Sequence, residues 1–317
     1  DNSNALAIEV IDGDLFFTTE QPTLSTWVSD GTPANTRVLF DGMRANYIRK
    51  YHDKIYFSIN TLDYFTQGVL RTDPDYTNLE TVVPDIQSNA LAFLSTADDK
   101  LIYAYPDATS GLEIFTIDED DFDLTLIKDI NQGSGNSDPR SFTELGTKSV
   151  FIADDGEHGL EFWVTDGSEG GTIILKDIFT GTLDPLMSEV YQYNKKLYFI
   201  ARSGTDGQQV WTSDGTDAGT YPIFEDPALS KDMMFGINNY LITTANGFVK
   251  IDVDTEDATP LALPPGYTNY VEIHAQPGLF IGDEVFFNTA AGPSPETTNG
   301  LELWKADVST NEITPVK

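Results

Sequence analysis

Cysteine is absent from all 317 residues of the chain, and so is any long apolar stretch. Without cysteine there are no disulfides, no thiolate nucleophiles and no cysteine-ligated zinc or iron–sulfur centres. Without 18 consecutive apolar residues, the sequence predicts no membrane-spanning helix. The first residues do not show the pattern of a signal peptide and begin with Asp rather than Met, so we expect either a processed mature chain or a piece of a longer one.

Basic residues are scarce, because 18 Lys and Arg stand against 51 Asp and Glu, which gives a net charge of −33. A field of that sign repels phosphate backbones and anionic lipid surfaces. The charge balance therefore predicts a protein that neither binds nucleic acid nor inserts into membranes. It also favours an extracellular or cell-surface location, because a strongly acidic surface keeps a secreted protein soluble in saline surroundings.

Catalytic motifs are missing as well. The three histidines, His52, His158 and His274, belong to no HExxH zinc motif. The sequence has no GxSxG elbow and no Rossmann fingerprint, and its glycine-rich stretch GSGNSDP (133–139) lacks the GK[ST] of a phosphate-binding loop. The sequence thus predicts no cofactor and no particular catalytic residue. Whether the protein is an enzyme stays open, with a non-catalytic role favoured.

What the sequence does contain is a repeat, in which an aromatic or large apolar residue precedes an Asp by three positions. We call the first position the core slot and the second the turn Asp. The seven copies are Trp27/Asp30, Leu70/Asp73, Phe115/Asp118, Trp163/Asp166, Trp211/Asp214, Val249/Asp252 and Trp304/Asp307. All four Trp of the chain occupy the core slot, which indicates that this position is buried in every copy.

Around each copy lie four short runs of β-branched and aromatic residues, separated by Gly, Asp, Asn and Pro, with no helical periodicity. Four-strand units of about 40 to 50 residues are typical of propeller blades. A four-stranded sheet that is apolar on both faces has to bury both, and neighbouring blades do this for one another. The sequence therefore predicts an all-β fold, a seven-bladed β-propeller of four-stranded antiparallel blades.

We expect one propeller domain over residues 1–317. Its expected blades cover residues 4–41, 46–86, 89–130, 140–178, 186–226, 232–263 and 270–317. The first blade should begin with its own strand near residues 5–10, and the last should end with its own strand near residues 312–317.

Several copies of the repeat resemble a known family. GLEFWVTDGSEGGTIILKDI (159–178), GQQVWTSDGTDAGT (207–220), STWVSDGTPANT (25–36) and GLELWKAD (300–307) are similar to the ELWxTDGT repeat of bacterial secreted and surface proteins. The other three copies depart from that pattern in the turn. The resemblance implies a β-propeller, commonly embedded in long exported proteins. It implies no settled activity, because propellers carry many functions.

The turn Asp has two possible roles. Asp followed by Gly or another small residue closes a hairpin, because its carboxylate accepts backbone N–H groups, and this structural role is the one that the sequence favours. Calcium is the alternative, since the pairs Asp73/Asp75, Asp118/Asp120 and Asp252/Asp254 offer oxygen ligands. None of these pairs fits the twelve-residue EF-hand loop, so the sequence predicts no metal site and leaves calcium as a weak possibility.

Non-repeated residues in the variable loops between the second and third strands, and in the links between blades, are the better functional candidates. As ligand-binding residues the sequence suggests Tyr64, Phe65, Asp138, Arg140, Glu157, His158, Arg202 and Asp206. We expect an extracellular binding or scaffold module that recognises a glycan or a protein through this loop face. The alternative is a polysaccharide-degrading lyase or hydrolase in which His158 or His274 acts with Tyr or Arg at the propeller mouth, and a third reading is a spacer or adhesin segment.

Overall fold

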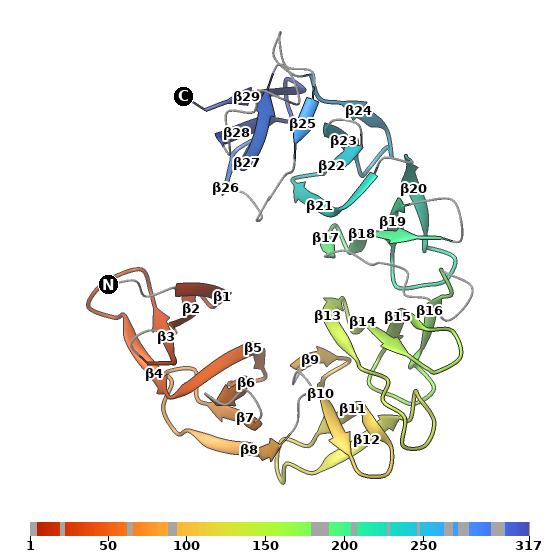
Figure 1. Ribbon diagram of the computed structural model, residues 1–317. Helices are drawn as coiled ribbons and strands as arrows, with labels where there is room; N and C mark the ends of the chain where they lie inside the picture. The colour runs from red at the N-terminus through yellow and green to blue at the C-terminus, as the bar shows by residue number, and fades with distance from the viewer. Residues whose placement is uncertain are drawn as a thin grey trace. The chain divides into compact units, whose positions relative to one another are not determined.

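The computed structural model describes residues 5–19, 23–61, 66–87, 94–178, 190–203, 208–226, 229–245, 248–262, 269–271, 279–292 and 302–316. The chain forms two compact units, Asp1–Ile174 and Leu175–Lys317. The regular structure of the described residues is β-strand throughout, arranged in seven antiparallel sheets whose strands follow one another in chain order (Figure 1). We number these sheets blade 1 to blade 7.

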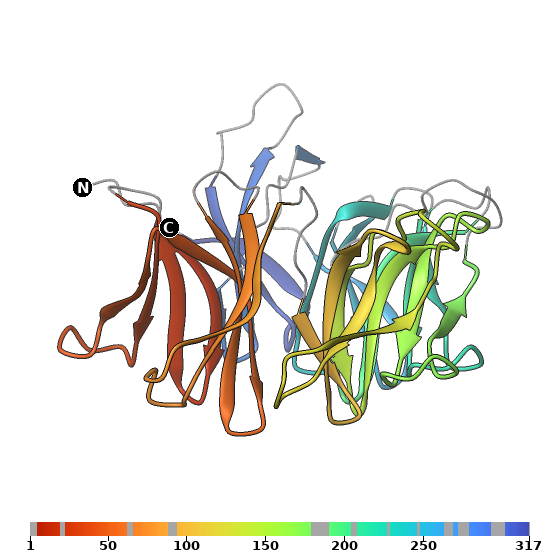
Figure 2. The same ribbon diagram turned by 90° about the horizontal axis from the view of Figure 1, so that it is seen from below.

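The first unit, seen from below in Figure 2, holds blades 1 to 3 and most of blade 4, whose last strand crosses the boundary after Ile174. Blade 1 consists of β1 (Ala5–Ile11), β2 (Asp14–Thr19), β3 (Ser25–Ser29) and β4 (Arg37–Asp41), and blade 2 of β5 (Met43–Tyr51), β6 (Lys54–Thr61), β7 (Thr66–Thr72) and β8 (Glu80–Gln87). Blade 3 consists of β9 (Leu94–Ala97), β10 (Lys100–Asp107), β11 (Gly111–Ile117) and β12 (Leu124–Lys128), and blade 4 of β13 (Arg140–Leu145), β14 (Lys148–Asp154), β15 (Leu160–Thr165) and β16 (Ile173–Lys176).

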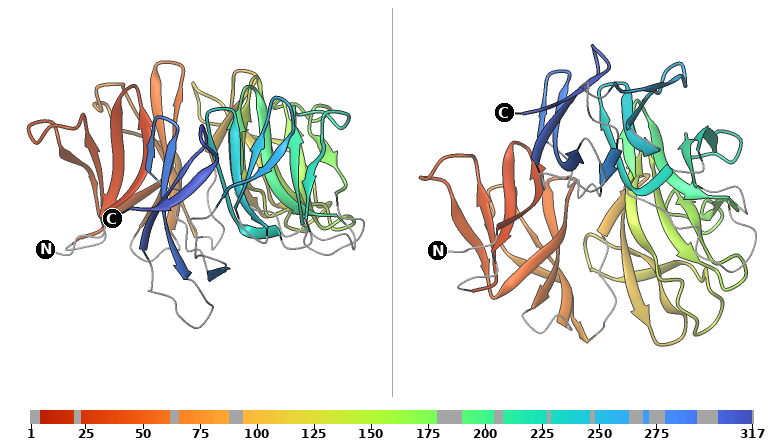
Figure 3. Two further views of the ribbon diagram at one scale, coloured as in Figure 1. Left: turned by 90° about the horizontal axis from the view of Figure 1, so that it is seen from above. Right: turned by 45° about the horizontal axis from the view of Figure 1, so that its top comes forward.

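The second unit holds blades 5 to 7, seen from two further directions in Figure 3. Blade 5 consists of β17 (Tyr191–Tyr193), β18 (Lys196–Arg202), β19 (Gln208–Ser213) and β20 (Tyr221–Glu225), and blade 6 of β21 (Leu229–Ile237), β22 (Tyr240–Ala245), β23 (Phe248–Asp252) and β24 (Ala258–Pro260). Blade 7 consists of β25 (Asn269–Val271), β26 (Leu279–Ile281), β27 (Glu284–Gly292), β28 (Glu302–Asp307) and β29 (Glu312–Pro315).

Blade 7 differs from the expected four strands because its innermost position is filled by two short strands. The N-terminal half of β27 pairs with β26 and the C-terminal half pairs with β25, so the sheet has five strands in all. At the ends of the chain the expectation is confirmed, since β1 pairs with β2 inside blade 1 and β29 pairs with β28 inside blade 7.

The core slot has the same register in every blade. In each one the slot residue on the third strand lies directly opposite an equivalent residue of the second strand. These pairs are Phe17↔Trp27, Phe57↔Leu70, Tyr103↔Phe115, Phe151↔Trp163, Phe199↔Trp211, Thr243↔Val249 and Phe287↔Trp304. Trp163, Trp211 and Trp304 are at most 5% exposed, and Trp27 is half-buried, so the slot is a core position as predicted.

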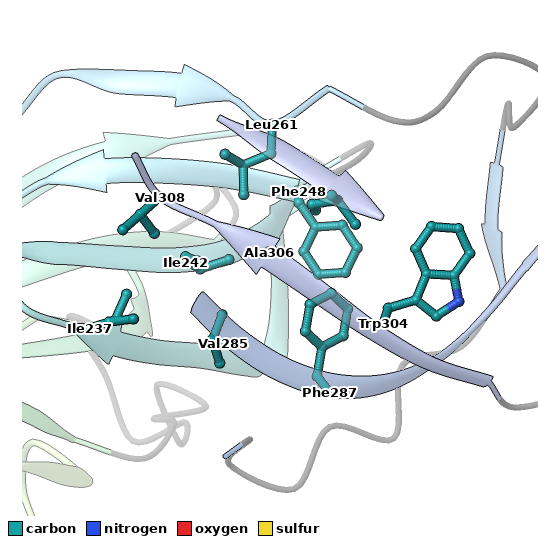
Figure 4. Packing of buried hydrophobic residues seen from close by; sticks show 10 residues of the cluster. Ile237, Ile242, Phe248, Leu261, Val285, Phe287, Trp304, Ala306 and Val308 are labelled. Atoms are coloured by element: carbon teal, nitrogen blue, oxygen red, sulfur yellow. The ribbon is translucent and has the colours of Figure 1, made fainter. Parts of the chain in front are cut away.

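Consecutive apolar residues along a strand point to opposite faces of its sheet, so both faces of a blade are buried. In β6, Ile55 and Phe57 pack against Phe16 and Phe40 of blade 1, whereas Tyr56 points the other way, into a cluster with Tyr103 of blade 3. The same packing of sheet on sheet joins blades 6 and 7 (Figure 4), where Phe248, Phe287 and Trp304 share one buried cluster. The predicted burial of both faces is therefore what holds neighbouring blades together.

One hydrogen-bonded turn explains the similar segments of blades 1, 4 and 5, which cover residues 25–36, 161–172 and 209–220. In blade 4, the carboxylate of Asp166 accepts the N–H and the hydroxyl of Ser168, at 2.9 and 2.6 Å. The hydroxyl of Thr172 lies 2.7 Å from that of Thr165 and donates to the carbonyl of Ser168. A Cβ on Gly171 would lie 2.0 Å from the Asp166 carboxylate, so glycine leaves room for the carboxylate in this turn; in blade 1 the same position carries Asn35, whose side chain donates to Asp30.

The turn Asp has its structural role in all seven blades. Each of these carboxylates accepts donors from the turn that follows it, mostly backbone N–H groups two or three residues ahead; the residues are Asp30, Asp73, Asp118, Asp166, Asp214, Asp252 and Asp307. Hydrogen bonds to the charged form lower a carboxyl pKa. The hydrogen bond from Ser168 accordingly lowers the pKa of Asp166, and that from Ser309 lowers the pKa of Asp307.

Basic side chains connect several blades to the turn of the next one along the chain. Six of them donate to carbonyl oxygens there: Arg37 to Asp75, Arg71 to Glu119, Lys100 to Gly167, Lys128 to Thr172, Lys176 to Asp217 and Lys250 to Val308. On a chain with only 18 basic residues, these cations are committed to holding sheets together.

Candidate functional site

Three loops of blades 3 and 4 are packed into one surface, which we call the loop cluster: residues 107–111 between β10 and β11, the link 129–140, and residues 154–159 between β14 and β15. The backbone N–H of Leu112 donates to the Asn136 side chain at 3.0 Å, and the N–H of Asp154 donates to the carbonyl of Ser137 at 2.8 Å. A Cβ on Gly111, whose φ is +73°, would lie 2.0 Å from the carbonyl oxygen of Gly135. The three loops therefore form one interlocked unit.

The fully buried acid Glu113 fixes the link through hydrogen bonds. Glu113 of β11 is 0% exposed and accepts the N–H of Asn131 at 2.9 Å, the N–H of Ile130 at 3.1 Å and the hydroxyl of Ser137 at 2.7 Å. Burial raises the pKa of Glu113 to about 7, against the effect of those three hydrogen bonds. The carboxylate thus holds the link in one conformation at the cost of burying a titratable group.

Two of the suggested ligand-binding residues lie on this link. Asp138 is exposed and has a φ of +46°, in the left-handed region, and Arg140 is half-buried at the start of β13. Between Arg140 and Thr143 the register of β13 shifts against β14, and Ser141 also has a positive φ of +56°. The bulge reorients the chain where the link enters the innermost strand of blade 4.

Glu157 and His158 lie in the adjoining loop, where Asp155 organises the turn. The Asp155 carboxylate accepts the N–H groups of Glu157 and His158 at 2.9 and 2.8 Å, and the His158 ring through Nδ1 at 2.7 Å. Burial raises the pKa of Asp155, but the hydrogen bonds from His158 and Glu157 outweigh it and leave that pKa below its ordinary value. With Nδ1–H directed at a carboxylate, a neutral His158 carries its lone pair on Nε2.

Of the eight suggested residues, the loop cluster brings together Asp138, Arg140, Glu157 and His158. Arg202 lies in the other unit, exposed at the end of β18, where it pairs with Gln208. The remaining three, Tyr64, Phe65 and Asp206, lie outside the described residues, as does His274.

A second charged group joins the innermost strands of the first unit. Arg49 of β5 donates through Nη1 to the carboxylate of Glu9 on β1 at 2.9 Å, and its Nε lies 3.5 Å from Glu144 on β13. Thr96 of β9 donates to Glu144 at 2.8 Å. Burial raises the pKa of Glu9, and the Arg49 guanidinium opposes the rise. These contacts tie all four innermost strands of the unit together.

In the part of the chain that the structure describes, no group of three or more His, Asp or Glu side chains is arranged to hold a metal ion. Within the same residues, no helix is both long and apolar enough to cross a membrane.

The sequence interpretation missed Glu113 and its counterpart Glu161, which is also 0% exposed. A signal for them exists, because Gly-Leu-Glu precedes the core slot in residues 111–113, 159–161 and 300–302. A repeated acid inside an apolar strand indicates a buried carboxylate with backbone partners.

Comparison with known proteins supports the fold. A solved structure from work on two prolyl endopeptidases matches 98% of this chain and 49% of its own, at 13% identity and a TM-score of 0.58. A puromycin-hydrolysing peptidase of Mycobacterium tuberculosis matches 87% of this chain and 46% of its own, at 11% identity and a TM-score of 0.50. The computationally designed Ika8 protein matches all of this chain and 87% of its own, at 14% identity and a TM-score of 0.52.

These likenesses define the class of the protein: an all-β, seven-bladed β-propeller with mostly four-stranded antiparallel blades. This chain spans about half the length of the two peptidases that it resembles. No family model matches the chain, and no curated protein matches its sequence. At identities of 11 to 14% the resemblance is one of fold alone.

Proposed function

We propose that this propeller is an extracellular binding module of the ELWxTDGT-repeat kind, and that it recognises a glycan or a protein through the loop cluster. The observation that carries the proposal is that the repeated and the non-repeated polar residues have different surroundings. Every turn Asp is occupied by its own turn, whereas the loop cluster holds non-repeated polar side chains on a rigid base. Rigid scaffolds that present variable loops are the usual arrangement of binding surfaces.

The composition of the loop cluster suits a polar ligand. Exposed Asp138 and Glu157 offer carboxylates to hydroxyl or amide donors, and half-buried Arg140 offers a guanidinium fork. Because Glu113 and Asp155 fix the backbone of these loops, little ordering is required when a ligand binds.

A polysaccharide lyase or hydrolase is the second candidate, and the His158–Asp155 pair favours it. A carboxylate 2.7 Å from Nδ1 orients an imidazole for proton transfer at Nε2, as in many general bases. In this reading His158 takes a proton from the substrate or from a water, and Arg140 stabilises negative charge that develops on the sugar.

Incubation with a panel of algal and bacterial polysaccharides separates the two. Retention on an immobilised polysaccharide with no change in its chain length supports the binding module, whereas shortening of the chains overturns it in favour of the enzyme. If the protein is not retained and the chains are not shortened, a glycan ligand is ruled out.

A matched pair of variants localises the effect. Glu157→Gln changes one exposed charge in the loop cluster, and Glu169→Gln makes the same change in the Asp166 turn at the other end of β15. We expect the first to weaken retention at least several-fold and the second to leave it unchanged. Equal effects of both would show that overall charge, rather than the loop cluster, governs retention.

A further inference from the structure

His52 occupies a position where the other blades use smaller turn residues. It is the first of two residues in the β5–β6 hairpin and has a φ of +51°. In the corresponding two-residue hairpins the same position has a positive φ and carries Asp, Asn or Gly: Asp12, Asp98, Gly146, Asn194, Asn238 and Gly282. These are the residues that type I′ hairpins prefer, so His52 is the exception among the seven blades.

Both ring nitrogens of His52 contact carboxylates of blade 3. Nε2 lies 2.6 Å from Oδ1 of Asp99, in the β9–β10 hairpin, and Nδ1 lies 2.6 Å from Oε2 of Glu119, in the turn after β11. The ring of Tyr51 stacks on the imidazole at 4.1 Å between centroids, and its hydroxyl donates to the carbonyl of Asp99. One side chain of blade 2 thus reaches two separate turns of blade 3.

This geometry requires two ring protons. An ionised carboxylate only accepts hydrogen bonds, and a neutral imidazole has one N–H to donate. Two carboxylates on opposite nitrogens are therefore both satisfied only by the imidazolium. Because the two carboxylates lie on opposite sides of the ring, they do not converge on a common metal ion.

We propose that His52 is a pH-dependent clamp between blades 2 and 3, in which the imidazolium holds both turns of blade 3 and loss of its proton releases one of them.

The charged surroundings of His52 favour the protonated form. Asp99 faces it from the β9–β10 hairpin and Glu119 from the Asp118 turn, and Asp53 follows it in its own hairpin. Arg71 of β7 also contacts Glu119, but it donates to the Glu119 carbonyl and to the Glu80 carboxylate. The hydrogen bonds from Glu119 and then Asp99 raise the pKa of His52 above its ordinary value. Its contribution to stability is therefore complete below about pH 6.5 and is lost as the pH rises through the folded-state pKa.

The direct test is an NMR titration of the histidine ring signals in the whole chain, with His52 assigned by its loss in His52→Gln. We expect a midpoint above about 6.5, and a lower midpoint in both Asp99→Asn and Glu119→Gln. The clamp is disproved if the midpoint lies at or below that value, or if neither variant moves it. His158→Gln is the control, because its Asp155 contact lies within its own loop and should leave the His52 midpoint unchanged.

A thermal measurement tests the consequence for the fold. The wild-type chain should lose more of its melting temperature between pH 6 and pH 9 than His52→Gln, which cannot titrate. An identical loss in both chains would mean that His52 does not hold the blades together.

Discussion

Glu113 gives the sharpest test of how the loop cluster is held. Its carboxylate, 0% exposed, serves three donors, and replacement by Ala leaves the N–H groups of Ile130 and Asn131 and the hydroxyl of Ser137 without their acceptor. A buried donor without a partner costs about 1–3 kcal/mol. With some recovery by water in the space left behind, Glu113→Ala should lower the free energy of unfolding by about 3–5 kcal/mol.

Glu113→Gln separates hydrogen bonding from charge. The folded pKa of Glu113, about 7, is raised above the ordinary 4.5 of a Glu, so the group stabilises the fold fully below pH 4.5 and progressively less as the pH rises through 7. Between pH 5 and pH 8 this loss amounts to about 2–3 kcal/mol. Glutamine keeps one acceptor oxygen and cannot ionise, so the variant should lack this part of the pH dependence.

Urea unfolding at pH 5 and pH 8, followed by tryptophan fluorescence, measures both effects. Glu157→Gln in the same loop cluster is the control, since its exposed side chain should leave the pH dependence as it is. The reasoning is refuted if Glu113→Gln loses as much stability as the wild type between the two pH values, or if Glu113→Ala costs less than about 1 kcal/mol.

Three further predictions concern blade 4. Asp166→Ala should lower the free energy of unfolding by about 1 kcal/mol at neutral pH through loss of the Ser168 hydrogen bonds. Because the folded pKa of Asp166 is lowered from 3.8, its contribution is complete above that pH and is lost as the pH falls through the folded pKa, so urea unfolding should show a smaller difference from the wild type at pH 3 than at pH 7. Gly171→Ala places a Cβ against the Asp166 carboxylate and should lower the melting temperature, whereas Gly170→Ala next to it meets nothing within 4 Å and should not; equal effects would contradict the turn geometry. Trp163→Ala should lower the free energy of unfolding, measured in urea, by about 3–5 kcal/mol, and Trp163→Phe should lower it clearly less. Equal losses in the two variants would contradict a tightly packed core slot.

The sequence predicted the fold well because its signal repeats. Seven copies of core slot and turn Asp average out the irregularities of any single blade, and burial and turn chemistry give the same answer in each. The split innermost position of blade 7 was not predicted, because β25 and β26 are three residues each and resemble loop segments.

The candidate site was predictable only in part. Sequence reasoning could choose Asp138, Arg140, Glu157 and His158 because non-repeated polar residues in loops stand out against a repeat. It could not show that Asn136 and Ser137 interlock the loops, because their contacts join residues more than twenty positions apart. The clamp at His52 was invisible for the same reason, since its partners Asp99 and Glu119 are 47 and 67 positions away.

Whether the loop cluster is the recognition surface is best tested by hydrogen exchange with a retained polysaccharide. We compare amide exchange of the chain alone and with the polysaccharide bound, at one pH. New protection should concentrate in residues 107–111, 129–140 and 154–159, with little change in the seven Asp turns. Protection confined to the Asp turns, or spread evenly over both sets, would contradict a binding module that works through its loop cluster.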